Sequence, residues 1–187
     1  MLKENLSDQN VNLKRPLPDK ETALVHFNSI DKSRNAFSPW LDWIENTNSA
    51  EDTLRFLQEA DQDWNNQTQF VYAIFYQEAF AGLISALNVS RKNKRAEIGY
   101  WLDIDYMGKG LMQKAVSLIE KELFENGFNR IVIHTDALNV KSANVARRCG
   151  YVFEGVLRQE RYSEIQGRFR DTNVFSKLKS DLKEGGI

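Results

Sequence analysis

A Gly-Lys-Gly turn stands at the start of an amphipathic helical pattern within residues 103–128, DIDYMGKGLMQKAVSLIEKELFENGF. Beyond the turn, apolar residues recur at the spacing of a helix with one buried face: Leu111, Ala115, Leu118, Ile119 and Leu123. Glycine costs about 1 kcal/mol relative to alanine inside a helix, so Gly108 and Gly110 at its start need a reason. The free N–H groups and the dipole of a first helical turn attract an anion, and glycines let it approach the backbone. The segment therefore favours an α/β fold in which a strand, a turn and a helix form a phosphate cradle.

Two familiar phosphate loops do not match this turn. The Walker pattern needs Gly-Lys-Ser/Thr after a four-residue spacer, which the turn lacks. The dinucleotide-binding pattern fails because Gln113 stands where its third glycine belongs, and because no βαβ unit opens the chain. An ordinary tight turn with a glycine in a left-handed position is the simpler alternative for an isolated Gly-x-Gly.

Hydrophobic periodicity and capping residues divide the rest of the chain into elements. Strands are predicted over residues 11–18, 69–76, 81–89, 95–104, 130–136, 151–160 and 169–178. Helices are predicted over residues 19–35, 49–64, 111–126 and 140–149, with Asp19, Ser49 and Asn139 at their N-termini. One strand, two helices, three strands, a helix, a strand, a helix and two strands make a mixed α/β order.

Composition limits the class of protein. The 187 residues fit one domain, placed at 1–187 with a core at about 11–178, and 42% hydrophobic residues are typical of a globular chain. The net charge is −1 with both signs scattered, so the sequence shows no basic surface for nucleic acid or membrane. A single cysteine, Cys149, excludes an intramolecular disulfide and favours a reducing, cytoplasmic compartment. The N-terminus is too polar for a signal peptide, and no segment approaches the ~18 apolar residues of a membrane span.

Two segments resemble the GNAT acyltransferases. Residues 105–110, DYMGKG, match the Gln/Arg-x-x-Gly-x-Gly/Ala loop of that superfamily at both glycines and depart from it at Asp105. Twenty-nine residues after Gly110 begins NVKSANVARRCGY, which is similar to the second GNAT segment: an asparagine, a short helix and Gly-aromatic. FSPWLDWIENTNSAEDTLRFL and AEIGYWLD further resemble the RimJ/RimL branch, the ribosomal-protein N-terminal acetyltransferases, and the resemblance extends over about 11–178.

This resemblance implies the GNAT fold, a mixed central sheet of about seven strands with about four helices. It implies that a central strand, near 96–102, splays from its neighbour and pairs with the pantetheine arm of acetyl-CoA, the co-substrate, while no metal is used. The diphosphate would lie on the amides of residues 107–112, and Asn139 would contact the arm or act only as an N-cap. The residues implied at the acetyl-CoA site are Trp101, Leu102, Met107, Gly108, Lys109, Gly110, Leu111, Met112, Asn139 and Ser142.

Direct acetyl transfer needs a neutral amine, a donor to the thioester oxygen and a proton for the departing thiolate. The resemblance implies that backbone N–H groups of residues 99–102 are the donors. Many GNAT enzymes protonate the thiolate with a tyrosine seven residues after the asparagine, but that position is Ala146 here. Ser142 matches a serine of the RimL branch that can reach the sulfur, so we assign it this role. The alternative is a serine that only occupies a first helical turn.

Two glutamates are candidates for the general base. Glu97 shares a strand face with Gly99 and Trp101, where burial in a cleft can raise the pKa of a carboxyl group. The alternative for Glu97 is a surface pair with an arginine such as Arg95. Glu160 lies near a functional glutamate of the RimL branch, but the loop there differs in length, so the sequence does not separate it from the neighbouring glutamate at 164.

The acceptor groove is expected near the first helices. Trp40 and Trp43 flank a short turn that lines this groove in relatives. The alternative is that both side chains pack in the core, as tryptophan most often does. Asp42 and Glu45 could receive a cationic N-terminus there. His134, in the middle of a strand, is interpreted as structural.

The leading hypothesis for function is therefore an N-acetyltransferase for the α-amino group of a ribosomal protein. An α-amine has a pKa near 7.7–8.0 and becomes neutral more readily than lysine, with its pKa near 10.4. The alternatives are an acetyltransferase for a small amine, such as a polyamine or an antibiotic, and an acyl-CoA-binding module without catalysis. Dimers are common among relatives, so a homodimer is also expected.

Overall fold

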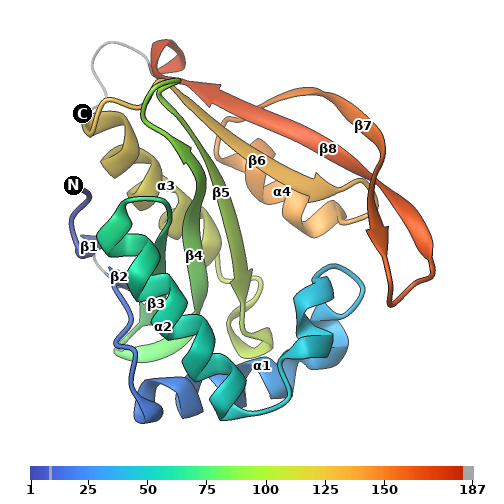
Figure 1. The fold of residues 1–187 in the computed structure, drawn as a ribbon. Coiled ribbons are helices and arrows are strands. Elements are labelled where there is room, and N and C mark those ends of the chain that lie inside the picture. The colour runs from blue at the N-terminus through green and yellow to red at the C-terminus, as the bar shows by residue number, and fades with distance from the viewer. Residues whose placement is uncertain (9, 183–187) are drawn as a thin grey trace.

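A computed structural model describes residues 1–8 and 10–182, and in them a mixed sheet carries helices on both faces (Figure 1). Its eight strands follow the order β1-β2-β3-β4-β5-β6-β8-β7. All neighbouring strands are antiparallel except β5 and β6, which are parallel. The strands are β1 Asn5–Asp8, β2 Val11–Lys14, β3 Phe70–Tyr76, β4 Ala79–Ser90, β5 Arg95–Leu102, β6 Arg130–Asp136, β7 Val152–Ser163 and β8 Arg168–Leu178. The helices are α1 Lys20–Phe37, α2 Ala50–Asn66, α3 Leu111–Glu125 and α4 Val140–Arg148, with 3₁₀ turns η1 Asp42–Asn46, η2 Ile104–Tyr106 and η3 Lys179–Asp181.

The sheet has eight strands rather than about seven because β1 escapes sequence prediction. Three of its four side chains are exposed and only Leu6 is buried, so it shows no apolar alternation. It forms because it pairs antiparallel with β2 and places Leu6 in the core, together with Leu2. The packed core therefore begins before residue 11.

The predicted helix starts are confirmed. The side chains of Asp19, Ser49 and Asn139 each accept a hydrogen bond from the backbone N–H three residues further on, at 2.8, 3.2 and 3.1 Å. Each therefore satisfies one of the N–H groups that a helix leaves unpaired at its N-terminus. No helix within residues 1–8 and 10–182 is long and apolar enough to cross a lipid bilayer.

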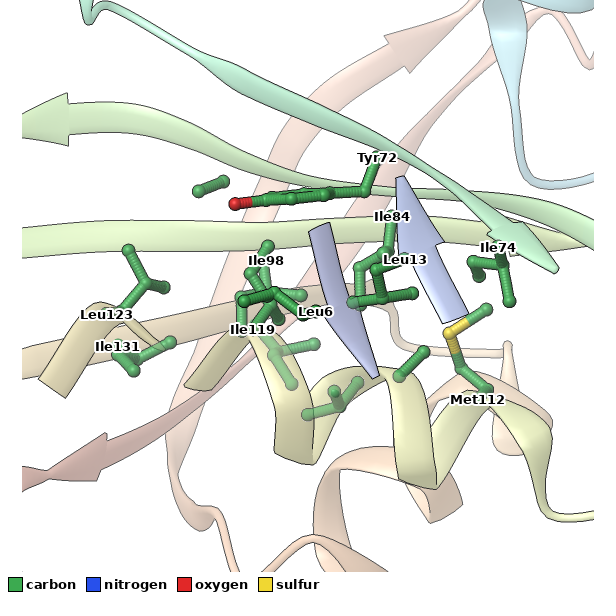
Figure 2. Packing of buried hydrophobic residues seen from close by; sticks show 14 of the residues in the cluster. Leu6, Leu13, Tyr72, Ile74, Ile84, Ile98, Met112, Ile119, Leu123 and Ile131 are labelled. Carbon is green, nitrogen blue, oxygen red and sulfur yellow. The ribbon is translucent and has the colours of Figure 1, made fainter. Parts of the chain in front are cut away.

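Helices pack against both faces of the sheet. Ile84 and Ile98 lie with Ile119 of α3 in the larger core cluster (Figure 2). On the opposite face, Trp101 packs edge-on against Phe37 of α1, with ring centres 5.4 Å apart. Full burial of side chains of this size contributes roughly 1.5–3 kcal/mol each. The central strands are thus fixed from both sides, which makes them a rigid support for a site.

The central strands β5 and β6 separate, as the resemblance implied. They pair only over Arg95–Glu97 and 130–132, whereas β4 stays paired with β5 as far as Leu102. From Ile98 onward, the side of β5 that faces β6 has no strand partner among the described residues. The backbone groups of 98–102 on that side fit the hydrogen bonds of an extended ligand such as a pantetheine arm.

Candidate active site

The Gly-Lys-Gly turn leads directly into α3. Gly108 and Gly110 have φ angles of 79° and 73°, in the left-handed region that favours glycine. Gly110 is the N-cap of α3 and offers no side chain to its first N–H groups. A Cβ atom at either glycine would meet no described atom within 4 Å, so the space above the turn is open. Uncapped amides beside open space fit a diphosphate, in addition to the conformational need for glycine.

The side chains predicted around the diphosphate divide into two groups. Leu111 and Met112 are buried in the core, so only their backbone N–H groups can contact a ligand. Met107 is half-buried, while Lys109 is exposed and its Nζ lies 5.2 Å from the centre of the Tyr106 ring. The turn therefore offers mainly backbone amides, with the exposed Lys109 ammonium group beside them.

Asp105, the departure from the GNAT loop, has a partner on α1. Its Oδ2 lies 2.6 Å from Nζ of Lys32, which is also 2.9 Å from Oδ2 of Asp103. Hydrogen bonds to Asp105 and then Asp103 raise the pKa of Lys32 above its usual range. Lys32 thus offsets a carboxylate charge that would otherwise repel phosphates at the turn.

Ser142 is held by two neighbours. Its backbone N–H donates to Oδ1 of Asn139, so Asn139 is an N-cap. The Tyr100 hydroxyl lies 3.1 Å from Oγ of Ser142 and 3.2 Å from its carbonyl oxygen. Burial raises the pKa of Tyr100 to about 12, so this hydroxyl keeps its proton at neutral pH. A tyrosine does reach this part of the site, but it comes from β5 rather than from the α4 position that Ala146 occupies.

Glu97, in the last paired position of β5, lies beside His134 of β6. Nδ1 of His134 lies 3.1 Å from Oε2 of Glu97, and Nδ2 of Asn88 donates to the same oxygen at 2.9 Å. Burial acts to raise the pKa of Glu97, but the hydrogen bonds from His134 and Asn88 outweigh it, so the pKa is lowered. The expectation of a raised pKa is therefore wrong, and the partner is His134 rather than Arg95.

Glu160 lies in an irregular part of β7. Residues 158–160 are inserted opposite Asp171, and Gln159 has a φ of 54°. The Gln159 N–H donates to Oδ1 of Asp171 at 2.8 Å, which gives Asp171 the role of holding this bulge. Glu160 itself is exposed and forms no hydrogen bond or ion pair with a described residue. The structure therefore connects Glu97, but not Glu160, to other groups of the site.

Trp40 and Trp43 lie outside both core clusters. Trp43 is 39% exposed, and its ring centre lies 6.4 Å from that of Trp101. Trp40 borders a cavity of about 30 Å³, enough for about one water molecule. The cavity is lined by Trp40, His134, Thr135, Asp136, Arg161, Arg170 and Thr172.

Arg170 connects the tryptophan turn to β8. Its buried guanidinium forms ion pairs with Asp42 of η1 and Asp136 of β6 and donates to the carbonyl oxygen of Pro39. Ser163 donates to the other carboxylate oxygen of Asp42 at 2.9 Å. Asp42 is therefore occupied by partners within the chain, which removes the reason to assign its carboxylate to an incoming amine.

The alternation of β5 places two different pairs on its two faces. Tyr100 and Leu102 lie on the face covered by α3 and α4, where Tyr100 meets Ser142. Glu97 and Trp101 lie on the opposite face, where Glu97 meets His134. The β5–β6 gap thus has a hydroxyl pair on one side and a carboxylate–imidazole pair on the other.

Three residues of this arrangement lie beyond the sequence prediction. Tyr100 was given no role, His134 was interpreted as structural, and Arg170 was not considered. Strand alternation does indicate the face on which Tyr100 lies, but not that α4 packs beside it. Within residues 1–8 and 10–182, no group of three or more His, Cys, Asp and Glu side chains is arranged to hold a metal ion.

Comparisons with known proteins agree with this geometry. The acetyltransferase (GNAT) domain family matches residues 12–152. The putative ribosomal N-acetyltransferase YdaF of Bacillus subtilis is 32% identical over 157 residues, 81% of this chain and 83% of that protein. The ribosomal-protein-serine acetyltransferase of Escherichia coli K12 is 29% identical over 150 residues, 80% of this chain and 83% of that protein.

A solved structure extends the comparison to three dimensions. RimL, a ribosomal L7/L12 α-N-protein acetyltransferase in complex with coenzyme A, superposes with a TM-score of 0.87 at 27% identity and covers 94% of this chain and 98% of its own. The family match spans most of the sequence, and the fold, the glycine turn and the splayed strands agree with it. The chain therefore belongs to the GNAT acetyltransferase family and uses acetyl-CoA as its co-substrate.

Proposed function

We propose that this acetyltransferase modifies the N-terminal α-amino group of a ribosomal protein in the cytoplasm. The relatives reported above are named for ribosomal proteins, which supports this acceptor class. The observation that carries the choice between acceptors is that carboxylates on the Glu97 face already have partners within the chain. Asp42 and Asp136 pair with Arg170, and Glu97 lies beside His134.

This charge pattern disfavours the polyamine alternative. A polyamine carries several positive charges and needs free carboxylates, whereas Asp42 and Asp136 are already paired with Arg170. A peptide N-terminus carries one charge followed by backbone carbonyl groups, which arginine side chains can bind by donating hydrogen bonds. Trp43, partly exposed beside Trp101, offers apolar contact area for the first side chains of such a peptide.

Residues on the two faces of β5 have different roles in acetyl transfer. The amides of Gly110 to Met112 and the free side of β5 bind and orient acetyl-CoA, and N–H groups of 99–102 donate to the thioester oxygen. Ser142 gives a proton to the departing thiolate from the α4 side. The base acts from the acceptor side, and the sequence predicts Glu97 or Glu160 for this role.

A turnover screen with acetyl-CoA tests the proposal. The acceptors are peptides with the N-terminal sequences of ribosomal proteins, the same peptides with a blocked α-amine, peptides with an internal lysine, and polyamines. We expect free thiol to be released only with unblocked N-terminal peptides. Preferred turnover of a polyamine would overturn the acceptor assignment, and acetyl-CoA binding without turnover of any acceptor would favour the non-catalytic alternative.

A further inference from the structure

We infer that His134, rather than Glu97, takes the proton from the acceptor amine, and that Glu97 positions His134 for this task. The inference rests on the proposed function only in requiring transfer to an amine. The two residues come from adjacent parallel strands, β5 and β6, and both side chains lie on the face opposite α3 and α4.

The contact between them fixes the tautomer of the imidazole. Nδ1 of His134 lies 3.1 Å from Oε2 of Glu97. An ionised carboxylate only accepts hydrogen bonds, so Nδ1 must be the nitrogen that carries the proton. In neutral His134 the lone pair is then on Nε2, at the far side of the ring from Glu97. This is the arrangement in which a carboxylate orients an imidazole as a base.

Glu97 is less suited to meet the amine itself. Its Oε2 already accepts from Asn88 and lies 3.1 Å from Nδ1 of His134. Its side chain is 14% exposed, against 25% for His134, so the imidazole is the more accessible member of the pair. The lowered pKa of Glu97 also keeps the carboxylate charged, which suits a group that orients a neighbour better than one that must hold a proton.

The position of His134 matches the place where the strands separate. The ladder ends with Glu97 opposite Val132, so His134 is two residues further along β6, at the rim of the gap. It lines the same cavity as Trp40, Arg161 and Arg170. An amine that enters from the tryptophan side would therefore pass His134 before it reaches the gap.

His134 and Ser142 together account for every proton that moves in the reaction. The amine nitrogen forms a bond to the thioester carbon, the C–S bond breaks, and one N–H proton moves to Nε2 of His134. Ser142 supplies a proton to the sulfur. Transfer of a proton through water from the imidazolium to the seryl oxygen then restores both residues, so no further reactant is needed.

Charged groups of both signs surround His134. They are Glu97 on β5, Asp136 on β6, Arg161 on β7 and Arg170 on β8. Asp42 of η1 pairs with Arg170. Because the surrounding charges are of both signs, the pH–rate profile must be measured against matched variants.

The two variants that separate the roles are His134→Asn and Glu97→Gln. Asparagine retains an N–H donor near Glu97 but has no group that can take the proton, so kcat should fall by about 10²–10⁴-fold and the acidic limb of the pH–rate profile should disappear. Glutamine removes the carboxylate charge and can turn its N–H₂ group toward Nδ1, so kcat should fall by as much as about 10⁴-fold, while the acidic limb should remain because the imidazole is still present. Acetyl-CoA affinity, measured by calorimetry, should stay within about twofold in both.

Nitrogen NMR of the imidazoles provides a readout that needs no acceptor. The chain has two histidines, and burial lowers the pKa of the other, His26, to about 3, so His26 stays neutral from pH 5 to 9. We expect the Nδ1-protonated tautomer for His134. An Nε2-protonated tautomer would overturn the inference, even if no acceptor were turned over. Loss of the acidic limb in Glu97→Gln with its retention in His134→Asn would overturn it in favour of Glu97, whereas an inactive wild-type enzyme would count against the proposed function.

Discussion

The Tyr100 hydroxyl on β5 lies 3.1 Å from Oγ of Ser142 on α4, and this contact joins the two elements that border the acetyl-CoA gap. The same hydroxyl lies 3.2 Å from the Ser142 carbonyl oxygen. Because its single proton is donated to this carbonyl oxygen, the Tyr100 hydroxyl can accept from Oγ of Ser142 and so fix the orientation of the seryl side chain. Tyr100 is therefore a positioning residue for Ser142, on a chain that has Ala146 where many relatives carry a tyrosine.

Tyr100→Phe should lower kcat by about tenfold and leave the KM for acetyl-CoA nearly unchanged. The ring still packs, but the hydroxyl that orients Ser142 is lost, at a net cost of about 1 kcal/mol for one hydrogen bond. Steady-state kinetics with the best peptide acceptor measures both constants. Tyr72→Phe is the matched control, because it removes a hydroxyl that donates to the Lys3 carbonyl at 2.8 Å, away from the gap. Equal losses of kcat in both variants would contradict a positioning role.

Ser142→Ala should lower kcat by about 10²-fold or more while acetyl-CoA affinity changes little. The thiolate would lose its proton donor, whereas the backbone N–H of residue 142 would still donate to Asn139. The split between kcat from turnover and Kd from calorimetry separates catalysis from binding. Ser117→Ala, an exposed serine on α3, controls for a general effect of serine removal on a helix. An unchanged kcat would remove Ser142 from the mechanism.

Gly110→Ala should weaken acetyl-CoA binding by about tenfold. A Cβ at this residue extends into the open space above the α3 amides, and a φ of 73° costs alanine roughly 1–2 kcal/mol. Gly127→Ala is a stringent control, because Gly127 follows the other end of the same helix, has a φ of 85° and also faces open space. Both variants should lose similar thermal stability, and only Gly110→Ala should lose affinity in calorimetry. A similar loss of affinity in both would show that strain alone explains the effect.

Features that depend on residues close together in the chain are predicted well from the sequence. The caps at Asp19, Ser49 and Asn139 and the left-handed glycines depend on neighbours within a few residues, so their patterns are visible in the chain. The strand β1 was missed because its stability comes from pairing with β2 rather than from its own pattern.

The sequence predicts only those parts of the candidate site that belong to a recognisable motif. Glu97 meets His134 because the parallel ladder of β5 and β6 ends at that point, and no local pattern states where a ladder ends. The sign of the Glu97 pKa shift was missed for the same reason: its hydrogen-bond donors are 9 and 37 residues away. The Tyr100–Ser142 contact spans 42 residues and depends on how α4 packs beside β5.

His26 should make the fold sensitive to mild acid. It is 1% exposed, its ring stacks 3.9 Å from that of Phe80, and its Nδ1 has no partner among the described residues. Burial lowers its pKa from the usual 6.5 to about 3. Between these two values the unfolded chain binds a proton that the folded chain does not, so stability falls as pH falls. From pH 7 to pH 5 this group alone should cost about 2 kcal/mol of unfolding free energy, measured by urea titration.

His26→Phe isolates this contribution, because phenylalanine retains a stacked ring beside Phe80 and cannot be protonated. All other titrating groups are common to the two proteins, so the difference between their pH dependences belongs to residue 26. The variant should lose about 2 kcal/mol less than the wild type between pH 7 and pH 5. Its kcat at pH 7 should be unchanged, since His26 lies on α1 and outside the acetyl-CoA gap. If both proteins lost the same unfolding free energy, His26 would have to be protonated in the folded state, and the acid sensitivity would have to come from the carboxylates instead.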